Sequence, residues 1–176
     1  MKIILDGMGG DNAPFSVVEG AVLASRETQH HICIIGQEEL IIPELKKYKY
    51  ESEKISVINA TQVISNDDAP VRAVRSKKDS SIVKGINMVK NGEGDIFISA
   101  GSTGALLAGG LFILGRIQGI DRPALASVYP IVGGIPSLLV DAGANADCKP
   151  NNLLEFGIMG NIYMEKVIGR KDPKVG

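Results

Sequence analysis

Three short apolar segments of this chain each run into a loop of small and polar residues, and a helical pattern follows each loop. The segments end at Leu5, Ser99 and Val140. Because such apolar segments alternate with amphipathic stretches, the sequence predicts an α/β fold, with a mostly parallel sheet and helices on both faces. Loops at the carboxyl ends of parallel strands gather at one edge of the sheet, where ligands bind. We therefore expect the three loops to form one site.

The same alternation predicts the secondary structure of the rest of the chain. Residues 65–81 are polar and are expected to form a loop, and the strands at 125–128 and 137–140 are expected to pair as a hairpin. Further strands are predicted at 2–5, 31–35, 55–58 and 96–99, and helices at 14–26, 38–48, from about 81 to 90, after Gly104, and at 152–167.

Length and composition limit the possible classes of protein. The chain has 176 residues, which is enough for a single α/β domain over 1–176, and its net charge of −1 argues against binding nucleic acid mainly through phosphate contacts. Asp6 interrupts the first apolar run, so no signal peptide is indicated. Two widely separated cysteines, Cys33 and Cys148, favour a reducing compartment, and we expect the protein to be cytoplasmic.

The loop that follows Ser99 has the composition of an oxyanion site. Gly101 and Gly104 allow a ligand to approach the backbone, Ser102 and Thr103 bring hydroxyl groups, and the helix that follows has free N–H groups at its start. A turn of small residues before a buried helix is also common for packing reasons alone. From these residues, both interpretations stay open.

The first loop combines carboxylates with glycines. It contains Asp6, Gly9, Gly10, Asp11 and Asn12, and either Asp11 or Asn12 is expected to cap the next helix. The spacing is not GxGxxG, which argues against a dinucleotide cofactor. The two histidines, at 30 and 31, have no acidic or cysteine partner at ligand spacing, so no metal is expected.

Two further clusters of polar residues are candidates. Arg75, Lys77 and Lys78 belong either to a solvated loop or to a flexible loop that reaches over an anionic ligand. The loop after Val140 brings another group of small and polar residues, namely Asp141, Gly143, Asn145, Asp147 and Lys149.

Four of these segments together carry a family resemblance. Residues 6–14 (DGMGGDNAP), 75–81 (RSKKDSS), 99–105 (SAGSTGA) and 141–147 (DAGANAD) occur in the same order as in the PlsX family. These are the acyl-ACP:phosphate acyltransferases of bacterial phospholipid synthesis. The resemblance implies transfer of a fatty acyl group from acyl-[acyl-carrier-protein] to inorganic phosphate, giving acyl phosphate for phosphatidic acid synthesis. It also implies a Rossmann-like three-layer sandwich, similar to phosphate acetyltransferases and isocitrate dehydrogenases.

The resemblance assigns roles to the candidate residues. Phosphate is already an anionic nucleophile, so neither a side-chain nucleophile nor a cofactor is required. The expected catalytic residues are Lys149, Asp141 and Asn145. The expected substrate-binding residues are Asp6, Gly9, Gly10, Asp11, Asn12, Arg75, Lys77, Lys78, Ser99, Gly101, Ser102, Thr103, Gly104, Gly143 and Asp147. For each aspartate, a role in bracing its loop is an equally good interpretation.

Members of that family are considerably longer than this chain, which suggests an N-terminal part of a longer fold that is incomplete at its C-terminus. The expected partners are acyl-carrier protein, phosphate and a second copy of the protein. A homodimer is expected because the apolar helices around 106–117 and 152–167 need covering. Membrane contact, if any, is expected beyond these residues. The alternatives are a short-chain phosphate acetyltransferase-like enzyme or, if the chain were whole, a non-catalytic ligand-binding scaffold.

Overall fold

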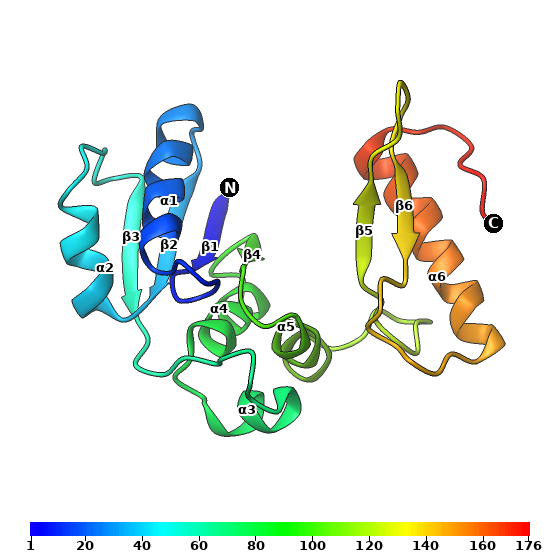
Figure 1. Cartoon of the computed structure of the whole chain (residues 1–176), viewed down its shortest axis with the longest axis horizontal. Helices are drawn as coiled ribbons and strands as arrows, with labels where there is room; N and C mark the ends of the chain where they lie inside the picture. The colour runs from blue at the N-terminus through cyan, green and yellow to red at the C-terminus, as the bar shows by residue number, and fades with distance from the viewer. The chain divides into compact units, whose positions relative to one another are not determined.

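The computed structural model describes residues 1–176, and these form two compact units, residues 1–115 and 116–176 (Figure 1). Each unit contains its own sheet and its own helices. The expectation of a single domain over 1–176 stays a prediction.

The first unit is built on a four-stranded parallel sheet. Its strands are β1 (Lys2–Asp6), β2 (His31–Gly36), β3 (Ile55–Asn59) and β4 (Ile96–Ile98), in the spatial order β3-β2-β1-β4. Within the sheet, Ile4 of β1 lies opposite Cys33 of β2 and Phe97 of β4. The predicted parallel sheet is confirmed.

Helices cover both faces of this sheet (Figure 1). On one face, α1 (Phe15–Glu27) and α2 (Glu38–Leu45) pack through Val18, Val22 and Ile41 against β2. On the other face, α4 (Ser81–Lys90) covers a cluster that contains Cys33, which is fully buried among apolar side chains. This burial makes Cys33 a packing residue.

A short helix lies where the sequence predicted only a loop. It is α3 (Pro70–Ser76), and it packs against α5 (Thr103–Gly109) (Figure 1). Pro70 occupies the first helical turn, where its missing N–H costs nothing, and Ala73 and Val74 are buried. The polar residues around this short apolar stretch hide the helical pattern in the sequence.

Two apolar segments of the first unit are more exposed than their sequence suggested. The apolar residues of strand β4 are typical of a buried strand, but β4 lies at the edge of the sheet, with Ile96 42% and Ile98 45% exposed. Helix α5 continues as one π-helical turn, η1 (Gly110–Leu114), and there Phe112 is 51% exposed. In this chain the helix is therefore not covered on every side.

The second unit places a hairpin against a helix (Figure 1). Strands β5 (Ala126–Tyr129) and β6 (Ser137–Val140) pair antiparallel, with Ala126 opposite Val140, which confirms the predicted hairpin. Helix α6 (Pro150–Tyr163) continues as η2 (Met164–Ile168). None of the helices has the length and apolarity needed to span a bilayer.

Candidate functional site

The ends of β1 and β4 are joined by one buried carboxylate. Because these strands are parallel neighbours, the loops that follow them start side by side. Asp6, at the end of β1, is 1% exposed, and its Oδ2 accepts a hydrogen bond of 2.6 Å from Oγ of Ser99. Its Oδ1 accepts a bond of 3.0 Å from the Met8 N–H. Ser99 Oγ in turn accepts a bond of 3.0 Å from the Gly101 N–H. Asp6 and Ser99 therefore fix the two loops relative to each other.

Two glycines allow this close contact between the loops. A Cβ atom on Gly9 would lie 2.6 Å from Asp6 Oδ2 and 2.7 Å from the Gly101 nitrogen. Gly10, next along the chain, has φ of +98°, a backbone conformation that residues other than glycine rarely adopt. Backbone geometry thus requires glycine at both positions of this loop.

The second loop ends in the first turn of α5. Ser102 is its N-cap, buried, with Oγ accepting a bond of 3.3 Å from the Ala105 N–H, while Thr103 is exposed. A Cβ atom on Gly104 would lie 2.7 Å from Cγ of Pro70, so this turn lies directly against α3. The hydroxyl of Ser102 is used in capping, and that of Thr103 faces solvent.

Asp11 and Asn12 lie exposed beyond the glycines of the first loop. Neither side chain caps α1, whose N-cap is Pro14. The expectation of an Asp11 or Asn12 cap is therefore wrong. Instead, the backbone carbonyl of Asn12 accepts bonds from the N–H and Oγ of Ser16, at 3.1 and 3.2 Å.

The candidate cations at 75–78 differ in their surroundings, because two of them contact the protein backbone and one is exposed beside an aromatic ring. Nζ of Lys77 donates to the Val63 carbonyl at 2.8 Å and pairs with Asp68 at 2.5 Å. The hydrogen bond from Lys77 is the main cause that lowers the pKa of Asp68. Nζ of Lys78 donates to the Val74 carbonyl at 3.3 Å. Arg75 is exposed, with its guanidinium 5.3 Å from the ring centroid of Phe112.

In the second unit, Asp141 organises the loop that follows β6. Its Oδ1 accepts a bond of 2.6 Å from the Leu125 N–H, and its Oδ2 accepts bonds from the N–H and Nδ2 of Asn145, at 2.7 and 3.1 Å. Burial raises the pKa of Asp141, but the hydrogen bonds from Leu125 and Asn145 outweigh burial, and its pKa lies below the usual value. Asn145 also donates to the Pro123 carbonyl at 3.0 Å.

The remaining residues of this loop have separate surroundings. Gly143 has φ of +90°, and the backbone carbonyl of Asp147 accepts a bond of 2.8 Å from Arg122. Lys149 is the N-cap of α6, where its N–H donates to Oδ1 of Asn152 at 3.0 Å, and the residue is exposed. The structure therefore brings Asp141 and Asn145 into contact and leaves the Lys149 amine without an acidic partner.

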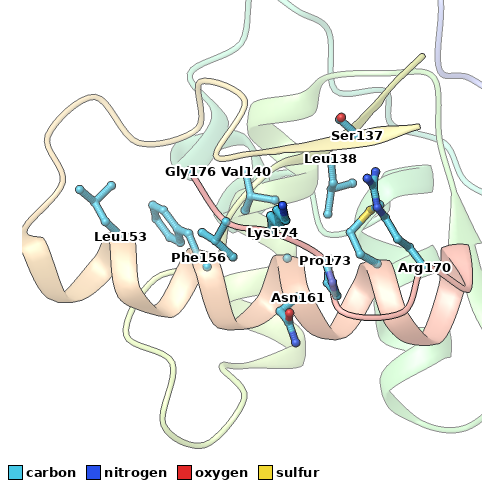
Figure 2. A pocket seen from close by; sticks show the side chains of 14 residues that line it. Ser137, Leu138, Val140, Leu153, Phe156, Asn161, Arg170, Pro173, Lys174 and Gly176 are labelled. Carbon is cyan, nitrogen blue, oxygen red and sulfur yellow. The ribbon is translucent and has the colours of Figure 1, made fainter. Parts of the chain in front are cut away.

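A hollow of about 470 Å³ lies in the second unit between β6, α6 and the segment that ends at Gly176 (Figure 2). Apolar side chains such as Leu138, Val140 and Phe156 line it, and Arg170 and Lys174 add two cations. None of the expected catalytic or substrate-binding residues lines this hollow. No three His, Cys, Asp or Glu side chains lie at metal-ligand spacing.

Comparison with known proteins assigns the chain to a protein family. Residues 1–176 match the family model described as "Fatty acid synthesis protein". The chain belongs to this family. Relatives named "Phosphate acyltransferase" include those of Alkaliphilus oremlandii, 61% identical over 175 residues, and Clostridioides difficile, 55% identical over 175 residues. Each alignment covers 99% of this chain but 52% of the relative, so the chain spans about half the length of these relatives.

Solved structures share the fold of this fatty acid synthesis protein family member. A phosphotransacetylase from Streptococcus pyogenes aligns with a TM-score of 0.69 at 24% identity, over 99% of this chain and 56% of that one. The EutD phosphotransacetylase from Staphylococcus aureus aligns with a TM-score of 0.67 at 19% identity, over 96% of this chain and 54% of that one. These likenesses confirm the predicted phosphate acetyltransferase-like fold.

Several residues of this family member that secure the loops and helix starts carry no signal in the sequence. Thr61 donates to Asp79 from its N–H at 2.8 Å and its Oγ1 at 2.6 Å, and Lys84 pairs with the same carboxylate at 2.5 Å. Pro70 supports the turn at Gly104. These contacts depend on the tertiary fold, so no local sequence pattern predicts them. Arg170 and Lys174 stand outside every motif.

Proposed function

We propose that the protein containing this chain transfers a fatty acyl group from acyl-[acyl-carrier-protein] to inorganic phosphate, giving an acyl phosphate for phospholipid synthesis. The observation that carries the proposal is that relatives named "Phosphate acyltransferase" match 99% or more of this chain at 50–61% identity. The hydrogen bond between Ser99 and Asp6, which we call the clamp, also supports the proposal. The clamp holds two loops of small residues together at the carboxyl edge of a parallel sheet.

The chemistry needs positioning more than it needs a reactive side chain. An oxygen of phosphate attacks the thioester carbonyl, and a carbon–oxygen bond forms as the carbonyl oxygen becomes an oxyanion. The carbon–sulfur bond then breaks, and the carrier leaves as a thiolate that takes up a proton. Donors fixed in advance lower the barrier by stabilising the anionic intermediate.

The loop from Gly101 to Gly104 is proposed to hold phosphate. The Gly101 N–H already donates to Ser99, so the groups proposed to meet phosphate are the N–H groups of Thr103 and Gly104 at the start of α5 and the hydroxyl of the exposed Thr103. Asp6 is a carboxylate and repels phosphate, so its proposed role is to fix the loop through Ser99. Gly9 and Gly10 shape the facing loop, and Asp11 and Asn12 are proposed to contact the substrate from its exposed part.

Cations are proposed to offset the charge of phosphate and of the intermediate. Arg75 and Lys149 are exposed and form no ion pair, so either can meet an anion. Lys77 and Lys78 donate to backbone carbonyls and are proposed to shape the segment between α3 and α4. Asp141 and Asn145, with Gly143 and Asp147, are proposed to form the loop that positions Lys149.

Several properties of the whole protein belong to the same proposal. We expect 1–176 to be the first part of a single longer fold and the protein to be a cytoplasmic homodimer. Its product is a fatty acyl phosphate, which partitions to membranes, so peripheral membrane contact through residues outside 1–176 is also proposed.

The test is an assay of the full-length protein with palmitoyl-carrier protein and phosphate. Hydroxylamine converts acyl phosphate to palmitoyl hydroxamate, and it also cleaves the carrier thioester directly, so reactions without phosphate and without protein give the background. Hydroxamate should rise well above this background only when phosphate and the protein are both present. A parallel reaction with acetyl-CoA should give far less product. Efficient turnover of acetyl-CoA alone would favour the short-chain phosphate acetyltransferase instead, and no hydroxamate above background from either donor would overturn the proposed activity.

A further inference from the structure

One face of α3 is concave, partly apolar and rich in cations. Ala69, Pro70, Val71, Arg72, Arg75 and Ser76 line a hollow of about 560 Å³ on it, which we call the α3 surface. Arg72 and Arg75 are three positions apart and therefore neighbours on the helix. Val71, 44% exposed, adds apolar area to this surface.

The cations of the α3 surface have no acidic partner within the chain. The nearby carboxylates of Asp68 and Asp79 are already paired, with Lys77 and Lys84 respectively, at 2.5 Å each. Neither Arg72 nor Arg75 forms an ion pair. Asp67 is the one nearby carboxylate outside an ion pair, and Arg72, Arg75 and Lys78 are also outside any ion pair, so a local excess of positive charge remains in a chain whose net charge is −1.

An aromatic ring supports one of these guanidinium groups. The Arg75 guanidinium lies 5.3 Å from the ring centroid of Phe112 in η1, and Phe112 is itself half-exposed. Arginine held over an aromatic ring beside an apolar hollow is a composition typical of the energetically important centre of protein–protein interfaces.

The α3 surface lies beside the proposed phosphate loop. The first residue of α3, Pro70, contacts the turn at Gly104, and α3 packs against α5. A protein docked on α3 would therefore be placed next to the loop from Gly101 to Gly104, within the same compact unit.

We propose that the α3 surface docks an acidic face of the acyl donor, the carrier protein. This inference rests on the proposed function and adds to it the place where the donor binds. Charge complementarity argues for an acidic partner, because Arg72 and Arg75 are unpaired. The hollow is shallow, and Val71 is the one large exposed apolar side chain that lines it, which is a small apolar anchor for binding to a bilayer.

The test compares donors in the full-length protein with Arg72→Glu. The KM for palmitoyl-carrier protein should rise at least tenfold at low salt. The KM for phosphate and the rate with a small palmitoyl thioester, palmitoyl-pantetheine, should stay unchanged. Lys90→Glu, which reverses an exposed cation in the last turn of α4, is the matched control and should leave all three values unchanged. A carrier variant with one acidic docking residue changed to Lys should restore the KM of Arg72→Glu.

Other outcomes would overturn the inference. An unchanged KM for the carrier would remove α3 from the docking surface, and an equal loss with palmitoyl-pantetheine would show a structural effect only. Loss of binding to phosphatidylglycerol vesicles with unchanged carrier KM would assign the surface to a membrane. If the wild-type protein makes no acyl phosphate, the proposed function fails, and titration of fluorescent carrier against wild type and Arg72→Glu still tests docking: equal affinities would overturn it.

Discussion

At the residue scale, the candidate site depends on a buried carboxylate that has a structural task. Asp6 and Ser99 are 93 positions apart, and their hydrogen bond of 2.6 Å is one of several that fix two loops at the ends of β1 and β4. Sequence analysis placed both residues at the site but left open whether Asp6 binds ligand or braces its loop. Its burial and its bonds to Ser99 and Met8 support bracing.

Replacing Ser99 with Ala in the full-length protein should weaken phosphate binding. The change removes the donor to Asp6 and the acceptor for the Gly101 N–H, which leaves the loop free to move. We expect the KM for phosphate to rise about tenfold, which corresponds to about 1.4 kcal/mol. Thr28→Val, which removes a bond of 3.0 Å at the end of α1, is the control and should leave this KM unchanged. An unchanged KM for phosphate in Ser99→Ala would show that the bond between Ser99 and Asp6 does not contribute to phosphate binding.

A methyl group on Gly9 should separate the two loops. Its Cβ would meet Asp6 Oδ2 at 2.6 Å, so we expect Gly9→Ala to lose about 1–3 kcal/mol of unfolding free energy. Gly20→Ala is the matched control, because a Cβ there meets open space within α1, and it should gain about 0.5–1 kcal/mol. Urea unfolding measures both. Equal stability of the two variants would mean that the loops are not tightly apposed.

At the element scale, the start of α4 is secured by Asp79 and Ser80. Ser80 is the N-cap, with Oγ accepting from the Val83 N–H at 3.3 Å. Asp79 joins the segment after β3 to α4 through Thr61 and Lys84. Hydrogen bonds from Lys84 and then from Thr61 hold the pKa of Asp79 well below its usual value.

This lowered pKa predicts a pH-dependent effect of Asp79→Asn. A carboxyl whose pKa is lower in the folded state stabilises the fold above its unfolded-state pKa of about 3.9, and this contribution falls as pH drops toward the folded-state pKa. Urea unfolding should therefore show Asp79→Asn less stable than wild type at pH 7 and pH 5, with a smaller difference at pH 3. A difference that does not change with pH would contradict the assignment.

The elements show what sequence patterns can and cannot reveal. The parallel strands and the hairpin at 126–140 follow from local apolar periodicity and turn residues, and they are as predicted. The cap of α1 is not as predicted, because Pro14 takes the N-cap position in place of Asp11 or Asn12. Helix α3 was missed because only Ala73 and Val74 are buried among polar residues. The exposure of β4 was missed because a strand at a sheet edge and a central one share the same apolar composition. The pairings of Asp79 and Lys77 depend on the tertiary fold.

At the scale of the whole molecule, apolar surface on α6 predicts association. Leu154, Ile158 and Ile162 recur every four residues, and each is about half exposed or more in this chain. Such a stripe is typical of a helix packed against another. We expect the full-length protein to sediment as a dimer at micromolar concentration and Ile158→Asp to shift it toward monomer. Leu40→Asp, on the exposed part of α2, should not. A monomeric wild-type protein would contradict this prediction.

The central claim is that phosphate, and not water, receives the acyl group. The most direct measurement follows the full-length protein with palmitoyl-carrier protein and phosphate by ³¹P NMR, while free carrier thiol is titrated in the same sample. We predict a new acyl phosphate resonance, with one acyl phosphate formed for each carrier thiol released. Release of thiol with free palmitate and no acyl phosphate, or no release of thiol at all, would contradict the account.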